Sequence, residues 1–87
     1  MRRGAAILGR NLRTPQGEID LLVGWHGERV AVEVRCRRGA DPVQEISDRK
    51  VETVARAARA AGAGRVDLVA VRLDRLGATV RWIPSVA

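Results

Sequence analysis

Two acidic residues, Asp20 and Glu33, occur in neighbouring segments that alternate between apolar and polar positions, 17–23 and 28–36. The dipeptide 26–27 separates these segments and has the character of a tight turn, so we expect a β-hairpin. A turn centred there places Asp20 opposite Glu33. Directly opposed side chains have Cβ atoms about 4.5–5.5 Å apart, and like charges at that distance destabilise a sheet unless something neutralises them. A divalent cation, which prefers carboxylate oxygens, is the natural candidate.

The same register places Glu18 opposite Arg35 and Leu22 opposite Ala31. We therefore expect one side of the hairpin to carry the charged residues, and the other side to form a core surface from Ile19, Leu21, Val23, Val30, Val32 and Val34. The alternation also fits an amphipathic hairpin whose charged side only faces water. On such a surface a cross-strand pair is more often acid against base, so the acid pair favours a metal site.

The composition favours a polyanionic partner. The chain has 87 residues, enough for one domain with a modest core, a net charge of +6 and a pI of about 11.4. This balance favours nucleic acid first and an acidic membrane surface second. Nearly all of the positive charge is arginine, whose planar fork suits phosphate, and Lys50 is the single lysine. Phe and Tyr are absent, which argues against an RNA reader built on a platform of aromatic rings.

Cys36 falls on the predicted apolar side of the hairpin after Val34, so we expect a buried structural thiol. One cysteine excludes an internal disulfide and a zinc cluster. The apolar stretch near the N-terminus is too short for a signal peptide, and no segment approaches membrane-spanning length. We expect a cytoplasmic protein with no membrane partner.

The other strands are predicted from the same patterns. We expect a first strand at 5–13, a turn at 14–17 and a basic loop at 37–42. The segment 66–73 is apolar on both sides, which is typical of a central strand covered on both faces, and 78–83 follows as its hairpin partner. The predicted order is βββαββ in a single domain that spans residues 1–87.

One helix is predicted between these two groups of strands. Ser47 is a suitable N-cap and Asp48 suits the positive helix terminus, although an earlier start at Asp41 is an alternative. The helix is expected to run to about Ala61 and to end at Gly62. Its inner stripe consists of small residues, Val51, Val54, Ala55 and Ala58, with Ile46 and Val51 as a hydrophobic staple. Its outer face carries Arg49, Glu52, Arg56 and Arg59.

Several motifs together resemble the YraN family of small bacterial proteins. They are NLRTPQGEIDLL at 11–22, VEVR at 32–35, Lys50 early in the helix and VDLVAV at 66–71. That family is similar to the PD-(D/E)xK nucleases and in particular to archaeal Holliday-junction resolvases. The resemblance implies a restriction-endonuclease-like α/β fold with a mixed sheet, and endonuclease-like hydrolysis of structured or branched nucleic acid, with DNA favoured.

The resemblance also implies roles for individual residues. Asp20 and Glu33 match the two acids that bind Mg²⁺ or Mn²⁺, and Arg35 stands where the motif usually has a catalytic lysine. Glu18 is either a further metal ligand or an ion-pair partner of Arg35. Arg13, Arg37, Arg38 and Lys50 are expected to hold the nucleic-acid backbone.

Two departures from the family pattern bear on activity. Arg35 stays protonated and cannot act as a base, so its role would be electrostatic only. Members of that family begin with a helix that carries another acidic residue, and we expect this chain to start too late to contain it. We expect either a misassigned start site or a protein that covers the exposed sheet by forming a homodimer. The alternatives to a nuclease are a nucleic-acid-binding module without catalysis and a structural or protein-interaction role.

Overall fold

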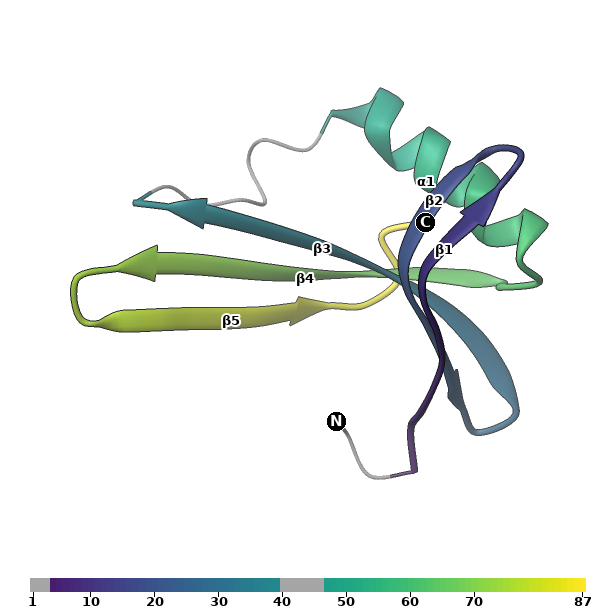
Figure 1. Ribbon diagram of the computed structural model, residues 1–87, viewed down its shortest axis with the longest axis horizontal. Coiled ribbons are helices and arrows are strands. Elements are labelled where there is room, and N and C mark those ends of the chain that lie inside the picture. The colour runs from purple at the N-terminus through teal and green to yellow at the C-terminus, as the bar shows by residue number, and fades with distance from the viewer. Residues whose placement is uncertain (1–3, 40–46) are drawn as a thin grey trace.

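The computed structural model of the chain describes residues 4–39 and 47–87. One helix packs on a five-stranded sheet whose strand order is β1-β2-β3-β4-β5 (Figure 1). The chain order is the predicted βββαββ, with the bounds β1 Ala6–Thr14, β2 Gly17–Trp25, β3 Glu28–Arg38, α1 Asp48–Ala60, β4 Arg65–Asp74 and β5 Gly77–Ile83. Strands β3 and β4 are parallel and all other neighbours are antiparallel, so the predicted mixed sheet is confirmed.

The turn between β2 and β3 lies where the sequence predicts it. His26 and Gly27 both have positive φ, 52° and 76°, as a two-residue hairpin turn of type I′ requires. This turn pairs Leu22 with Ala31 and Val23 with Val30, which is the predicted register. The local turn chemistry therefore determines how the first part of the hairpin is aligned.

Strand β3 is the central element of the sheet. Its first residues pair with β2, and residues from Val30 onward pair with β4. Strand β3 has both β2 and β4 as hydrogen-bonded neighbours only along Val30–Val32. These are the most buried residues of β3, each at most 2% exposed. The remainder of β3 extends with β4 and β5 as an arm, which lies on the left of Figure 1. Arg37 and Arg38 belong to this strand, so the loop predicted from residue 37 begins later.

Helix α1 begins and ends close to the predicted residues. The Ser47 hydroxyl caps it by accepting a hydrogen bond of 3.2 Å from the backbone N–H of Lys50. Ala61 is the C-cap, and Gly62 follows with a φ of 79°. The outer arginines and Glu52 are exposed as predicted, and the buried stripe is formed by Val54, Ala57 and Ala58. The alternative start at Asp41 and the staple residue Ile46 lie outside the described residues.

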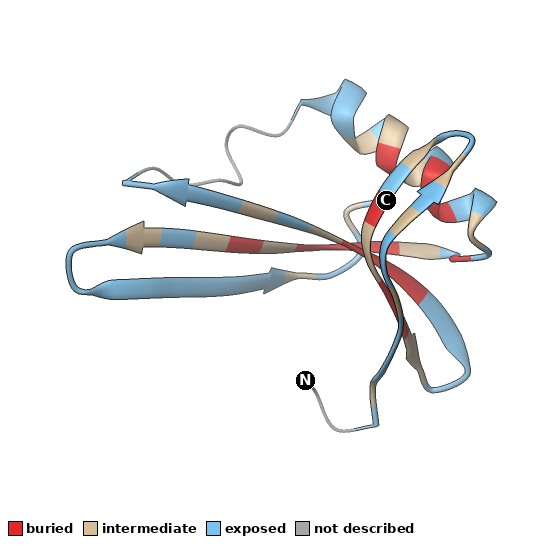
Figure 2. Cartoon of the chain, viewed as in Figure 1, coloured by how far each residue is buried: buried red, intermediate tan, exposed pale blue. Residues whose placement is uncertain are grey.

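The prediction that only one side of the hairpin is apolar core is wrong. A cluster that includes Ile19, Leu22 and Ala31 packs against α1, whereas Val23, Val30 and Val32 form a second cluster on the opposite face. The helix therefore covers the same face that carries Glu33. Figure 2 shows the buried residues concentrated where the strands cross and on the inner side of the helix.

Burial decreases along the arm. On β4, Val66, Asp67 and Leu68 are buried, but the strand is half-buried or exposed from Val71 onward, so the prediction of cover on both faces holds only for its first part. Cys36 is exposed, contrary to the prediction of a buried thiol, because β3 extends here beyond the second core cluster. Within the described residues, no helix is long and apolar enough to cross a membrane.

Asp67 is a buried charge on the face opposite the helix, with 1% of its surface exposed. Its carboxylate accepts two hydrogen bonds from the Arg65 guanidinium, of 3.0 and 3.1 Å. It accepts two more, 2.8 Å from Trp82 Nε1 and 3.0 Å from the backbone N–H of Ser85. Both carboxylate oxygens are therefore satisfied, and the bonds tie β5 and the residues after it to β4.

Candidate functional site

The two predicted acids meet where strands β2 and β3 separate. The backbone ladder between these strands ends at Leu21 and Val32. Ile19 and Leu22 both lie in the cluster that packs against the helix. Regular alternation would put residues three apart on opposite faces of a strand, so β2 must twist between them, at Asp20. Asp20 Oδ2 then accepts a hydrogen bond of 2.8 Å from the backbone N–H of Val34. A carboxylate thus satisfies a donor of β3 that the departing strand leaves unpaired.

Glu33 lies beneath the first turn of the helix. Its side chain is 12% exposed, and its Oε1 is 4.0 Å from Lys50 Nζ. The pKa of the Glu33 carboxyl is raised above its ordinary value, first because burial disfavours the ionised form. The negative charge of Asp20 and a hydrogen bond with it raise the pKa further, whereas the charges of Lys50 and Arg35 act in the opposite direction. The two acids are therefore electrostatically coupled, as their predicted opposition implies.

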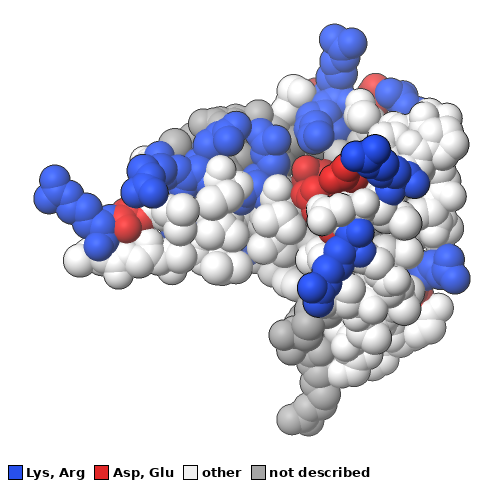
Figure 3. Space-filling model, in the orientation of Figure 1, with Lys and Arg blue, Asp and Glu red and all other residues white. Residues whose placement is uncertain are grey.

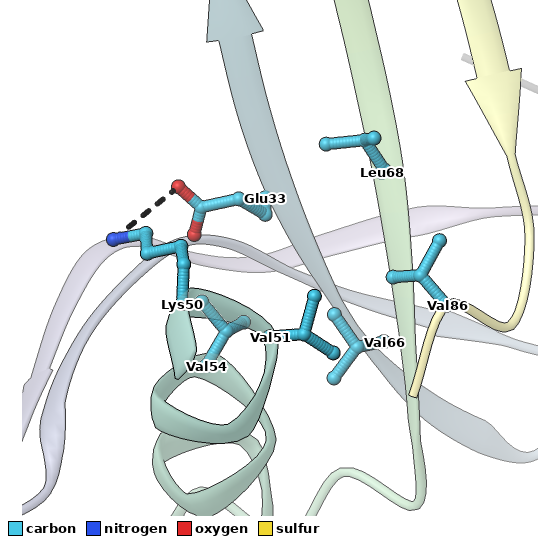
Figure 4. A pocket seen from close by; sticks show the side chains of 7 residues that line it. All are labelled: Glu33, Lys50, Val51, Val54, Val66, Leu68 and Val86. Carbon is cyan, nitrogen blue, oxygen red and sulfur yellow. Dashed lines mark ion pairs between the residues drawn. The ribbon is translucent and has the colours of Figure 1, made fainter. Parts of the chain in front are cut away.

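Glu33 borders an apolar cavity of about 150 Å³. Figure 4 shows Glu33 and Lys50 at one side of it, with aliphatic side chains from α1, β4 and the C-terminal residues forming the rest of the wall. These are Val51, Val54, Val66, Leu68 and Val86. Few groups there can solvate a carboxylate, so Glu33 depends on its charged neighbours or on a bound cation.

Arg35 follows Glu33 on the same face of β3. Its Nε is buried and has no hydrogen-bond partner among the described residues. A buried donor without an acceptor is unfavourable, and a bound anion is one way to satisfy it. The guanidinium stays protonated, so it supplies positive charge next to the acids.

Glu18 lies away from this pair. The prediction that Glu18 faces Arg35 is wrong, because β2 has separated from β3 before this position. Glu18 pairs with Arg13 of β1 instead, both in the strand register and through an ion pair of 3.9 Å. The part of the chain that the structure describes holds no cluster of three acidic, histidine or cysteine residues able to bind a metal.

Asp20 and Glu33 by themselves fit a hard divalent cation. Mg²⁺ is commonly held by one or two carboxylates and completes its coordination with water and substrate phosphate oxygens. The repulsion between the two acids is what such an ion would relieve. The donor set is therefore suitable for Mg²⁺ or Mn²⁺.

The four residues predicted to hold a nucleic-acid backbone are not gathered at one place. Arg13 pairs with Glu18, Lys50 lies next to Glu33, and Arg37 and Arg38 occupy the far end of β3. Figure 3 shows Lys and Arg side chains along the arm and a group of acidic side chains near the middle of the surface in view. Two arginines that the sequence pattern did not single out also lie on the arm, Arg72 on β4 beside β3 and Arg81 on β5 beside β4.

A model of the uncharacterised protein family UPF0102 matches residues 1–71. The chain belongs to this family. The finding confirms the resemblance to the YraN family. A UPF0102 protein of Aquifex aeolicus is 41% identical over 56 residues, which are 64% of this chain and 54% of that protein. One of Corynebacterium efficiens is 39% identical over 83 residues, covering 85% of this chain and 68% of that protein.

The UPF0102 chain spans about half the length of the first of these relatives, and 55% of one from Thermotoga neapolitana. Among solved structures it is similar to Hjc, a Holliday junction resolvase from Archaeoglobus fulgidus, with a TM-score of 0.59. That match covers 93% of this chain and 65% of the resolvase at 23% sequence identity. It shows the fold, and so confirms the predicted restriction-endonuclease-like α/β architecture.

Proposed function

We propose that this UPF0102 chain carries the site of a metal-dependent endonuclease that hydrolyses phosphodiester bonds in structured or branched DNA. One observation carries the proposal. Asp20 and Glu33 are brought together at the separation of β2 and β3, in a desolvated position flanked by positive charge. Perturbed acids next to charged partners are typical of catalytic sites. The resolvase-like fold supports the same interpretation.

The roles follow from the chemistry of each residue. A bound Mg²⁺ or Mn²⁺ would activate the attacking water and neutralise charge on the phosphate. Asp20 and Glu33 would hold that ion, with Asp20 oriented by its hydrogen bond from Val34. Arg35 would place positive charge beside the scissile phosphate. Lys50, whose Nζ is 4.0 Å from Glu33 Oε1, would offset the charge of Glu33 when no cation is bound.

Hydrolysis forms a bond from the water oxygen to phosphorus and breaks the bond from phosphorus to the leaving sugar oxygen, which takes up a proton. Arg35 provides positive charge but no base for this step. This observation favours a second candidate function, a nucleic-acid-binding module that has the nuclease scaffold without the chemistry. The lack of a third acidic ligand among the described residues favours it as well.

A cleavage assay with Mn²⁺ on branched and flayed DNA tests the proposal. We expect Glu33→Gln to abolish cutting and Arg35→Ala to reduce it by about 10²-fold, the usual effect of removing one charged group that stabilises a transition state. Arg35→Lys should retain or increase activity. Glu52→Gln, which changes an exposed acid on the outer face of the helix, is the matched control and should cut normally.

The absence of cleavage by the wild type, with binding retained, would favour the binding module. Cleavage by Arg35→Lys alone would mean that the scaffold is competent and that Arg35 blocks the chemistry. Equal cleavage by the wild type and Glu33→Gln would refute the acidic pair as the site.

A further inference from the structure

The face of the sheet that α1 covers continues beyond the helix onto the arm. Alternation along β3 puts Arg35 and Arg37 on this face, because Ala31 and Glu33 already lie there beneath the helix. The parallel register puts Ala70 next to Arg35, and Arg72 next to Arg37. The antiparallel register between β4 and β5 adds a further arginine, on the other side of Ala70.

Arg81 of β5 is this fourth arginine, because it pairs with Ala70 of β4. We call the four arginines of this face the arginine surface: Arg35, Arg37, Arg72 and Arg81. Ala70 between them is only 2% exposed although its two register partners are arginines, so these long side chains lie close over the sheet.

The charges of this surface are of one sign. Among the described residues of the same face, the acids of the strands are Asp20 and Glu33 at its inner end and Asp74 at its outer end. Asp74 is occupied at the β4–β5 turn, where its Oδ1 accepts a hydrogen bond from the backbone N–H of Leu76. Four arginines on three neighbouring strands concentrate positive charge there, so the arginine surface is suited to an anion. The buried Nε of Arg35, which has no hydrogen-bond partner within residues 4–39 and 47–87, points to the same kind of ligand.

We propose that the arginine surface binds the phosphate backbone of a DNA duplex and leads it to Asp20 and Glu33. This inference rests on the proposed function, since it names the substrate form that the site receives. Residues two apart on a strand are about 6.6 Å apart and neighbouring strands about 4.8 Å, so the surface offers several guanidiniums to successive phosphates. It leads directly to Glu33, which is two residues before Arg35 on the same strand.

The duplex form follows from what this face lacks. Single-stranded nucleic acid is usually bound by aromatic rings that stack on bases, together with a positive groove. Both tryptophans lie on the opposite face, where they line a small pocket with Arg65 and Asp67. The arginine surface therefore provides contacts to phosphates alone, which carry no sequence information. The occupant is a duplex bound without regard to sequence.

The test measures binding of a fluorescent duplex in EDTA, without cleavage, as the NaCl concentration increases from 50 to 200 mM. The variant is Arg72→Gln with Arg81→Gln, and the control is Arg56→Gln with Arg59→Gln on the outer helix face. Both doubles lower the net charge of +6 by two, and all four arginines are exposed, so folding should be retained. A circular-dichroism spectrum checks this.

The slope of log K against log salt should fall by about 1.8 in the Arg72/Arg81 double, at about 0.9 for each phosphate that is no longer neutralised. The control should change the slope by much less. Equal losses of affinity in the two doubles would overturn the inference, because net charge alone would then account for the binding. Tighter binding of a single strand than of the duplex would overturn it as well.

The outcome is separable from that of the proposed function. Duplex binding with the expected decrease in slope in the Arg72/Arg81 double, but no cleavage in Mn²⁺, supports the arginine surface and removes the catalytic role. Cleavage with equal losses of affinity in the two doubles supports catalysis and removes the arginine surface. No binding of the duplex by the wild type at 50 mM NaCl overturns the arginine surface, and the cleavage assay with Mn²⁺ then decides the proposed function on its own.

Discussion

Replacing Asp67 with asparagine tests how far the stability of the arm depends on one buried carboxylate. Asp67 accepts four hydrogen bonds, two from Arg65, one from Trp82 and one from the backbone of Ser85. An asparagine can keep two of them with its single oxygen, and its amide group then faces the other two donors. Asp67→Asn therefore leaves one N–H of Arg65, and either Trp82 or Ser85, without an acceptor.

The cost can be worked out from these hydrogen bonds. Each buried donor without a partner costs about 1–3 kcal/mol. The Arg65 side chain is 28% exposed, so water can replace part of its missing bond. We therefore expect the free energy of unfolding to fall by about 2–4 kcal/mol. This is a large part of the total, since the free energy of unfolding of a small domain is only about 5–15 kcal/mol. At about 4–8 °C for each kcal/mol, the melting temperature should fall by at least about 8 °C.

Urea unfolding followed by tryptophan fluorescence measures the change. Asp74→Asn is the matched control, because its carboxylate accepts one turn hydrogen bond of 2.8 Å at an exposed position and should cost no more than about 1 kcal/mol. Trp82→Phe provides a second check, since it removes one donor and should cost less in the Asp67→Asn background than in the wild type. A free energy of unfolding for Asp67→Asn within roughly 0.5 kcal/mol of the wild type, the range of neutral surface changes, would contradict the expected cost.

Three other predictions concern Glu33, Lys50 and Cys36. The raised pKa of Glu33 means that the folded state binds more protons between the unfolded and folded pKa values, so stability falls as the pH rises through that interval. Glu33→Gln should accordingly be more stable than the wild type at pH 7 but not at pH 3, as measured by urea unfolding; a constant difference would contradict this. Lys50→Ala removes the ammonium group next to Glu33, which competes with a metal ion for the carboxylate. Calorimetry should show Mn²⁺ binding that is tighter by about two- to fivefold, which corresponds to the usual strength of a partly exposed ion pair. Weaker Mn²⁺ binding would instead place Lys50 among the groups that support the metal. The exposed Cys36 should react with a thiol reagent in the folded protein at a rate close to that in urea, and protection would show that this face is covered in solution.

The site was only partly predictable, and its residues show why. That Asp20 and Glu33 approach one another follows from the position of one turn, because the hairpin register depends on local chemistry. The predicted pairing of Glu18 with Arg35 was wrong because β2 leaves β3 before this position. The point of separation is set by Ile19, which packs in the cluster against the helix. Lys50 comes next to Glu33 because the crossover between β3 and β4 returns the helix over this face, an ion pair between residues 17 positions apart.

Local sequence patterns are enough to predict the strands, the helix and their order. Alternation defines the strands, His26 and Gly27 form the turn, and the Ser47 side chain caps the helix, all within a few residues of one another. Three other features depend on how the elements pack: the face that the helix covers, the exposure of Cys36 and the donors that surround Asp67. These features depend on interactions between residues far apart in the chain, whose side-chain types give no local signal of their partners. The periodicity of a strand distinguishes its two faces, but only packing determines which of them the helix covers.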